Sequence, residues 1–323
     1  MDSYVKVGLY GKINHFKARL VAKGYTQIFG LDYSDTFSPV AKMASVKLLL
    51  CIAVMRHWPL HQLDIKNAFL HGNLEEEVYM EQPHGFVAHG ESSNMVCRLH
   101  KSFYGIKQSP RAWFDRFSTV VQQFGMMRSE ADHSIFYRHS AQGCIYLIVY
   151  VYDIVIIGSD EQIIHQLKHN LYTQFQTKDL GKLRYFLGIE VAQSKDGLVI
   201  LQRKYAMDIL EETCLLNAKL VDTLMDPNVK LLPNQGELLS DSRRYRRLVG
   251  KLNYLTVTCP NISFAVTVVS QFLNSPCQEQ MEAVIWVLKY IKGAPGKGLI
   301  YEDKGHARIV GYSDADWTKF TYR

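Results

Sequence analysis

Long hydrophobic runs are absent from this sequence. No apolar stretch approaches the roughly 20 residues that a helix needs to cross a bilayer, so a membrane protein is not expected. Residues 1–16 contain neither a long apolar stretch nor a small-residue cleavage site. A secretory signal peptide is therefore not predicted.

Closely spaced cysteines are missing as well. The six cysteines lie far apart and none forms a C-x-x-C pair, so neither a zinc site nor a disulfide framework is expected. Reduced thiols are typical of proteins that are not exported. We therefore expect an intracellular protein, cytoplasmic or nuclear, that is not secreted.

The composition favours a folded protein. Hydrophobic residues make up 47% and charged residues 21% of the 323 residues, which excludes global disorder. At roughly 100–200 residues per domain, this length allows two domains or one large domain with subdomains. The net charge of +6 is compatible with a polyanionic partner but does not identify one.

Hydrophobic periodicity predicts several elements in the first two thirds of the chain. A buried hairpin of two β-branched runs is expected over residues 144–158, with its turn at Tyr152–Asp153, and a short strand is expected just before Lys66–Gly72. The glutamate run Glu75–Glu77 is interpreted as a solvated loop. Helices are predicted over residues 44–58, 110–125 and 160–175.

The character of the sequence changes after about residue 203. Before it, residues 182–202 are interpreted as two strands joined at Asp196–Gly197, and after it residues 217–240 are rich in turn-forming residues. We expect a domain boundary within 203–240. Helices are predicted over residues 203–216, 242–258, 262–274 and 281–293.

Two aspartates stand in apolar, strand-like surroundings. Asp64 follows the short strand and Asp153 lies at the turn of the hairpin. Because an ionised carboxylate in such surroundings is costly unless it is paired or bound to a metal, both are candidate ligands for a hard cation such as magnesium. The alternatives at this point are an ordinary turn aspartate for Asp153 and a strand-end cap for Asp64.

Nine segments, taken in order along nearly the whole chain, resemble the reverse transcriptase of copia-type LTR retrotransposons. The order and number of these segments make the resemblance far more specific than any single motif. They are KARLVAKGYTQ (17–27), QLDIKNAFLHG (62–72), EVYMEQPHGF (77–86), KSFYGIKQSPRAWF (101–114), YVYDIVIIG (150–158), KDLGKLRYFLGIEV (178–191), QRKYAMDIL (202–210), RLVGKLNYLTVT (247–258) and YSDADW (312–317).

The resemblance implies an α+β, right-hand polymerase. Fingers and an antiparallel palm sheet would occupy residues 1–203, a helical thumb and connection 204–300, and the truncated start of a ribonuclease H domain 301–323. The implied partners are an RNA or DNA template with its primer and deoxynucleoside triphosphates, and no membrane; the oligomeric state is left open. The implied cofactor is magnesium or manganese, as two ions that support nucleotidyl transfer.

The resemblance also assigns catalytic roles. Asp64 and Asp153 would hold the metal ions, with the carbonyl of Ile65 as a further ligand. Lys178 would donate a proton to the leaving pyrophosphate. Phe69 would pack under the sugar of the incoming nucleotide and exclude a 2′-hydroxyl.

The remaining implied roles concern nucleotide and primer binding. The triphosphate would meet cations in the fingers, and the templating base pair would lie against a segment in which a glycine permits close approach of the backbone. A short strand turn would grip the end of the primer. The residues are Lys17, Arg19 and Lys23 for the triphosphate, Tyr104, Gly105 and Gln108 for the base pair, and Phe186, Leu187 and Gly188 for the primer.

One departure from the family pattern concerns the metal site. The family's hairpin reads Tyr-Val-Asp-Asp, whereas this chain reads Tyr150-Val151-Tyr152-Asp153. A phenol with a pKa near 10 stays neutral at pH 7 and is a poor magnesium ligand. We therefore expect weakened metal binding and slow polymerisation.

Two further departures concern the ends of the chain. Asp314 matches the first carboxylate of the ribonuclease H domain, but too few residues follow it for a stable domain. We expect no cleavage of RNA and a frayed C-terminus. The strands that precede KARLVAKGYTQ in the family are expected to be missing or scrambled in residues 1–15, which would leave the fingers incomplete.

Four hypotheses follow. The chain is a polymerase remnant with an impaired metal site, or a working polymerase for which Asp64 and Asp153 suffice, or a nucleic-acid-binding module without enzymatic activity, or a relic without function. The substitution at Tyr152 argues against the second hypothesis. The third predicts duplex binding that weakens steeply with salt.

Overall fold

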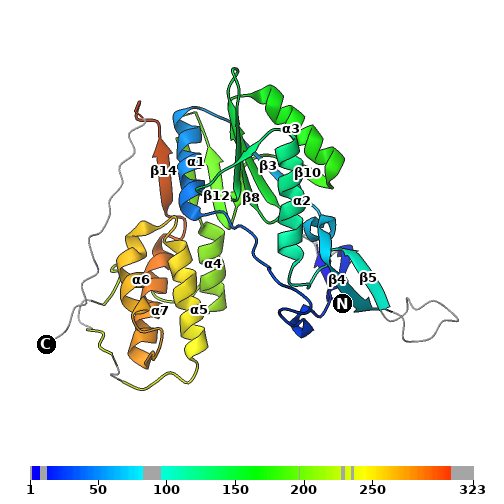
Figure 1. Cartoon of the computed structure of the whole chain (residues 1–323). Helices are drawn as coiled ribbons and strands as arrows, with labels where there is room; N and C mark the ends of the chain where they lie inside the picture. Colours follow the sequence, from blue (N-terminus) through cyan, green and yellow to red (C-terminus); the bar gives the residue numbers. More distant parts are fainter. Residues whose placement is uncertain are drawn as a thin grey trace.

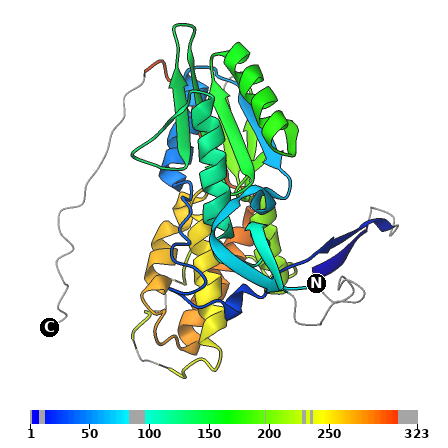
Figure 2. The same cartoon turned by 45° about the vertical axis from the view of Figure 1, so that its right-hand side comes forward.

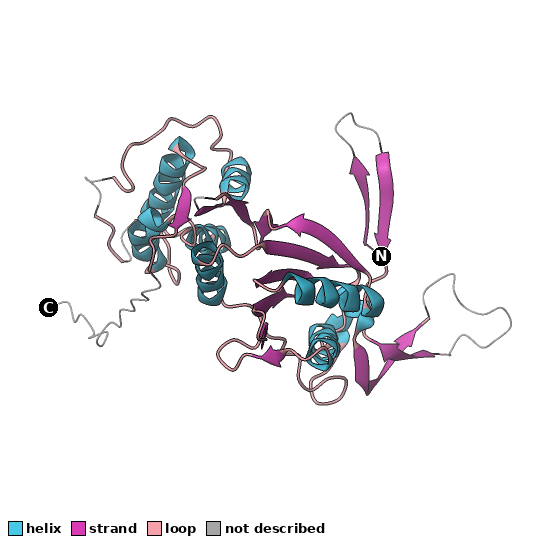
Figure 3. Cartoon of the chain, turned by 90° about the horizontal axis from the view of Figure 1, so that it is seen from above, coloured by secondary structure: helices cyan, strands magenta, loops and turns pink. Residues whose placement is uncertain are grey.

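The computed structural model of the chain describes residues 2–7, 13–82, 96–195, 197–226, 230–233 and 236–306, and for 2–7 and 13–19 it describes the backbone alone. Antiparallel sheets and helices make up the fold, which confirms the expected α+β class (Figure 1). Figure 3 shows the magenta strands between helices on both sides of the molecule.

A six-stranded antiparallel sheet, here called the central sheet, has the strand order β10-β3-β9-β8-β7-β6. The β-branched runs of β8 and β9 form its middle, where almost every residue of β9 is buried because both faces of the sheet are covered. Its strands are β3 (Leu60–Ile65), β6 (Met127–Arg128), β7 (Ile135–His139), β8 (Cys144–Tyr150), β9 (Asp153–Gly158) and β10 (Thr177–Lys182).

Helices α2 (Ser109–Gln123) and α3 (Glu161–Gln174) cover one face of the central sheet. Helix α1 (Met43–Met55) covers the other face together with a second, four-stranded antiparallel sheet. The second sheet has the order β11-β12-β13-β14, and its strands are β11 (Tyr185–Phe186), β12 (Ile189–Gln193), β13 (Gly197–Leu201) and β14 (Gly298–Glu302).

Four helices pack around a separate hydrophobic core and are here called the helical unit. Figure 2 shows this unit below the central sheet. Its largest buried side chain is that of Tyr245. The elements are α4 (Arg203–Glu212), α5 (Ser242–Leu255), α6 (Ser263–Ser270) with the preceding 3₁₀ turn η3 (Pro260–Ile262), and α7 (Gln278–Gly293).

Local chemistry sets several helix starts. The carboxylate of Asp160 accepts a hydrogen bond from the backbone N–H of Ile163 at the start of α3. Asp241 accepts from two backbone N–H groups at the start of α5. Pro110 lies in the first turn of α2, where its missing N–H costs no intrahelical hydrogen bond.

The helices lie within or close to the predicted ranges, but α1, α4, α5 and α6 end three or four residues earlier than expected. Helix α1 shows the reason most clearly. It ends at Met55 rather than at residue 58, because His57 takes a left-handed φ of 52° before the chain reaches Pro59. The predicted hairpin turn also shifts by one residue. Asp153 already pairs with Tyr150 as the first residue of β9, so the turn consists of Val151 and Tyr152.

The expectation of a solvated loop at Glu75–Glu77 is wrong. These residues lie in β4 (Asn73–Glu81), which pairs with β5 (Val96–Lys101). Exposure alternates along β4, so Glu76 points inward and forms a partly buried ion pair with Arg111 of α2. Because the inward residue Glu76 is charged, the alternation along this strand does not appear as a hydrophobic pattern with a period of two.

The strands that were expected to be missing or scrambled in residues 1–15 have a regular backbone where the structure describes it. Strand β1 (Asp2–Val7) pairs with β2 (Ile13–Arg19) in an antiparallel hairpin. The boundary expected at residue 301 falls within β14, which pairs with β13.

Among the described residues, no helix is long and apolar enough to cross a membrane.

A partly buried ion pair connects α3 to the edge of the central sheet. The Nζ atom of Lys168 lies 3.0 Å from Oδ2 of Asp179 in β10 and 3.2 Å from Nδ1 of His61 in β3. Burial opposes the charge on Asp179, but hydrogen bonds from Gly181 and Lys168 outweigh it and hold the pKa of that carboxyl below its ordinary value. The pair therefore stabilises the fold above the ordinary aspartate pKa, and this contribution is lost as the pH falls through the lowered pKa.

We expect Asp179→Asn to lower the free energy of unfolding by about 1–2 kcal/mol at pH 7, because it leaves Lys168 without its carboxylate. The loss should shrink as the pH falls below the ordinary aspartate pKa and through the lowered pKa of the native carboxyl. Urea unfolding at pH 7 and pH 3 measures both values, with Lys182→Gln at the exposed end of β10 as the control. Equal losses at the two pH values would contradict this assignment.

Candidate functional site

Three of the sequence-predicted residues meet in one row across the central sheet. Asp64 of β3 lies directly opposite Asp153 of β9 on one side and opposite Lys178 of β10 on the other. Directly opposed residues of antiparallel strands project to the same face with Cβ atoms about 5 Å apart. The register therefore brings two carboxylates and one ammonium together on the face that also carries α1.

The turn beside this row is held by neighbouring backbone and side-chain donors. The N–H of Ile65 donates to the carbonyl oxygen of Tyr152 at 3.0 Å, and Nε1 of Trp113 donates to the carbonyl oxygen of Val151 at 2.6 Å. Val151 takes a φ of 55°, which is unusual for a β-branched residue. These two hydrogen bonds fix the turn against β3 and α2.

The pKa of Asp153 reflects its burial first and the nearby charge of Asp64 second. Burial, together with the charge of Asp64, raises the pKa of Asp153 to about 6. Accumulated negative charge of this kind is what a bound divalent cation relieves, so the two carboxylates fit one hard cation. Among the described residues, no group of three or more histidine, cysteine, aspartate or glutamate side chains is close enough to hold a metal ion.

Tyr152 occupies the outer position of the turn. Its side chain is 49% exposed and contributes no carboxylate to the row of Asp64 and Asp153. With Tyr152 in the turn the hairpin is intact, because Tyr150 pairs with Asp153 across it.

A second group of predicted residues lies next to β3. Phe69 belongs to η2 (Ala68–His71), and its ring meets that of Tyr104 edge to face, with centroids 5.9 Å apart. The hydroxyl of Tyr104 donates to Oδ1 of Asn67 at 3.4 Å. The structure thus brings Phe69 and Tyr104 together at the end of the strand that carries Asp64.

The segment before α2 is tied to the segment that follows β2. The N–H of Ala22 donates to the carbonyl oxygen of Tyr104 at 2.7 Å, and Nε2 of Gln27 donates to Oε1 of the buried Gln108 at 3.0 Å. Gly105 has a φ of 89°, and a Cβ there would lie 2.2 Å from the carbonyl oxygen of Ala22. Only glycine allows the two backbones to approach this closely.

No described contact places the predicted triphosphate-binding cations next to Asp64 and Asp153. Lys23 is exposed and lines a cavity of about 550 Å³ between residues 20–27 and the β4–β5 hairpin. The backbones of Lys17 and Arg19 lie in β2. Asp314 lies outside the described residues.

The predicted primer-binding residues form the turn between β11 and β12. Phe186 is buried, while Leu187 and Gly188 have left-handed φ values of 52° and 72°. The hydroxyl of Tyr254 in α5 donates to the carbonyl oxygen of Leu187. Nε2 of the buried Gln62 donates to the carbonyl oxygen of Tyr185 at 2.8 Å.

Sequence reasoning missed Gln62, Tyr254 and Gln27 as parts of this site. Gln62 could have been found from the period of two, since it stands two residues before Asp64 and shares its face of β3. Tyr254 and Gln27 act through partners 67 and 81 residues away, and no local pattern indicates such contacts.

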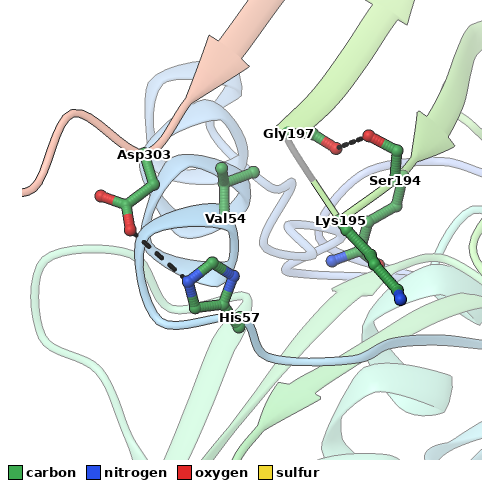
Figure 4. A pocket seen from close by; sticks show the side chains of 7 residues that line it. Val54, His57, Ser194, Lys195, Gly197 and Asp303 are labelled. Atoms are coloured by element: carbon green, nitrogen blue, oxygen red, sulfur yellow. Dashed lines mark hydrogen bonds and ion pairs between the residues drawn. The ribbon is translucent and has the colours of Figure 1, made fainter.

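A further cavity, of about 420 Å³, lies at the end of α1 beside the β12–β13 turn (Figure 4). His57 and Asp303 form one side of it, with Nε2 and Oδ2 3.5 Å apart, and Ser194, Lys195 and Gly197 lie on the opposite side. None of the sequence-predicted site residues lines this cavity.

Comparison with known proteins agrees with the arrangement of these residues. The sequence model of the family described as reverse transcriptase (RNA-dependent DNA polymerase) matches residues 6–227. The chain belongs to this reverse transcriptase family. The resemblance expected from the nine segments is therefore confirmed.

The chain is similar to copia-type polyproteins of plants. It is 44% identical over 307 residues to the retrovirus-related Pol polyprotein from transposon RE1 of Arabidopsis thaliana, covering 95% of this chain and 21% of the relative. It is 39% identical over 315 residues to that from transposon TNT 1-94 of Nicotiana tabacum, covering 94% and 24%. The reverse transcriptase chain thus spans about a fifth of the length of the first relative.

A telomerase structure from Candida albicans gives a TM-score of 0.32 at 11% identity, covering 77% of this chain and 44% of that chain. This similarity is too low to support an argument about the fold of the reverse transcriptase chain.

We expect Gly105→Ala to destabilise the protein by about 3 kcal/mol or more, because it combines a left-handed φ with a collision against the backbone of Ala22. Gly181→Ala is the matched control, since Gly181 has a φ of 77° but nothing within 4 Å of the added Cβ. Its cost should be about 1 kcal/mol. Denaturant unfolding measures the difference, and equal costs would show that the contact between the two segments is loose.

We expect Asp153→Asn to stabilise the metal-free protein at pH 7. Because the native carboxyl holds its proton up to about pH 6, whereas the unfolded one releases it near 3.8, the free energy of unfolding of the wild type falls as the pH rises between these values. The variant lacks this fall and should gain about 1–2 kcal/mol between pH 4 and pH 7, less than the full shift implies because solvent screens the half-buried carboxyl.

Thermal unfolding with a chelator present measures this gain, and Asp208→Asn, on the exposed side of α4, is the control. A difference between variant and wild type that does not change with pH would contradict the raised pKa of Asp153.

Proposed function

We propose that this chain is the polymerase part of a copia-type reverse transcriptase that binds primer–template but transfers nucleotides slowly. The observation that carries the proposal is the position of Tyr152 in the turn between β8 and β9. It adjoins Asp153, which lies directly opposite Asp64. The family pattern has an aspartate at this position.

Asp64 and Asp153 would hold magnesium or manganese, and the carbonyl of Ile65 is a further candidate ligand. The bound cation would neutralise phosphate charge and lower the pKa of the primer hydroxyl. Lys178, which lies opposite Asp64, would donate a proton to the leaving pyrophosphate. Because these groups lie close together, a change in the charge of one would shift the pKa values of the others.

The neighbouring residues would select and orient the nucleotide. The ring of Phe69, supported edge-on by Tyr104, would exclude a 2′-hydroxyl from the sugar site. The Tyr104–Gln108 segment would lie against the templating base pair, and Lys23, Lys17 and Arg19 would attract the triphosphate. The turn Phe186–Gly188 would hold the primer end.

Tyr152 weakens the site through charge. Two divalent cations beside a triphosphate require several acidic oxygens, and a phenol that stays neutral at pH 7 supplies none. A loss of about 4 kcal/mol of transition-state stabilisation corresponds to about a thousandfold slower reaction. The proposed partners are an RNA or DNA template with its primer and deoxynucleoside triphosphates, and the proposed location is intracellular.

We expect Tyr152→Asp to accelerate primer extension by about a thousandfold. Single-nucleotide extension of a labelled primer on an RNA template, with magnesium or manganese, measures the rate. Tyr152→Asn is the matched control because it removes the ring without adding charge, and it should stay slow. Adding Asp64→Asn to Tyr152→Asp should abolish the gain.

Equal rates for the wild type and Tyr152→Asp would refute the impaired metal site. Recovery in Tyr152→Asn would assign the defect to the bulk of the ring rather than to the missing charge. Binding of the wild type to a primer–template duplex, measured between 50 and 200 mM salt, should weaken by at least tenfold. The absence of any binding would refute the proposed function itself.

A further inference from the structure

The turn between β11 and β12 is held from two sides. On one side, Gln62 donates to the carbonyl oxygen of Tyr185 at 2.8 Å. On the other side, the hydroxyl of Tyr254 donates to the carbonyl oxygen of Leu187. Gln62 belongs to the central sheet and Tyr254 to the helical unit, so this turn lies between two bodies with separate hydrophobic cores.

The turn has a backbone that needs such support. Leu187 and Gly188 both take left-handed φ values, 52° and 72°. The left-handed region is unfavourable for leucine, and such a conformation persists where the surrounding structure holds it. A Cβ added to Gly188 would lie 3.7 Å from Cε1 of Tyr254, so the tyrosine ring itself packs against the turn.

Tyr254 is firmly placed within the helical unit. It lies in the last turn of α5, between the buried Leu252 and Leu255, and its ring meets that of Tyr205 in α4 edge to face at 5.4 Å. Burial, with smaller effects from neighbouring tyrosines, raises its pKa to about 12. Its hydroxyl therefore remains a donor over the whole physiological range of pH.

The second residue that holds the turn, Gln62, lies in the same strand as Asp64. Gln62 is buried and stands two residues before Asp64 in β3, so the two side chains share one face of the strand. Tyr150, opposite Asp153 in the catalytic hairpin, lies close enough to Tyr254 to influence its titration. The turn, the hairpin and the last turn of α5 thus adjoin one another.

We propose that Tyr254 is a positioning residue whose hydroxyl locks the Leu187–Gly188 turn between the helical unit and β3, so that a bound primer end is held opposite Asp64. This role rests on the proposed function, because it presumes that the turn meets the primer. It assigns no contact between Tyr254 and the reacting atoms. The contribution of Tyr254 is to keep the turn in its left-handed conformation.

Tyr254→Phe tests the role because it removes the hydroxyl and keeps the ring. Hydrogen exchange of the amides of residues 186–190 should quicken by about five- to tenfold, the amount expected for one lost hydrogen bond. Dissociation of a fluorescent primer–template duplex should quicken by a similar factor. Tyr205→Phe is the matched control, since it changes the partner ring in the same core and should alter neither rate.

A double-mutant cycle with Gln62→Met adds a readout that general destabilisation would not move. If both residues hold one turn, the effects of Tyr254→Phe and Gln62→Met on duplex dissociation are not additive. Global unfolding of each variant is measured in parallel. Additive effects that follow the change in global stability would overturn the positioning role.

The remaining outcomes are also decisive. Unchanged exchange at residues 186–190 in Tyr254→Phe would show that the hydroxyl does not hold the turn. Faster exchange with unchanged duplex dissociation would show that the held turn does not position the primer. If the wild type binds no duplex at all, the proposed function fails and primer positioning with it, while the exchange rates still decide whether Tyr254 holds the turn.

Discussion

The pairing of β3 with β9 is the constraint on which the rest of this reverse transcriptase depends. Its register places Asp64 opposite Asp153 and, through β10, opposite Lys178. Two carboxylates in this position repel each other, and burial adds to the cost, as the raised pKa of Asp153 shows. The pairing persists because the same strands bury Leu63, Ile154 and their neighbours under α2 and α3, so hydrophobic packing outweighs local repulsion.

Around this pairing, the supports of the site come from distant parts of the chain. Trp113 of α2 holds the turn of the catalytic hairpin, and Gln27 holds the segment before α2. Gln62 and Tyr254 hold the turn between β11 and β12. Each support is a single hydrogen bond onto a backbone carbonyl or an amide, which fixes geometry without adding charge near the carboxylates. The charge of the site is therefore set almost entirely by its own few ionisable groups.

Elements with strong local periodicity could be predicted from the sequence, and contacts between distant segments could not. The amphipathic spacing of α2 and α3 and the β-branched runs of β8 and β9 each contain their own signal. The strand at Glu75–Glu77 was missed because its inward residue, Glu76, is charged and is paired with Arg111, so the alternation is not one of hydrophobicity. The apolar surroundings indicated Asp64 and Asp153 as candidate metal ligands and the family resemblance assigned them to one site, whereas their register comes from long-range sheet pairing that periodicity does not encode.

The position of Tyr152 explains why the fold does not depend on which residue stands there. Residue 152 lies at an exposed turn, and the hydrogen bond it accepts from Ile65 uses the backbone carbonyl, which any residue provides. A carboxylate at this position would add negative charge beside Asp153, whose pKa is already raised by burial and by the charge of Asp64. The interactions that stabilise the protein and those that would bind metal thus make opposite demands on this turn. Selection for stability alone would not favour an aspartate at this position.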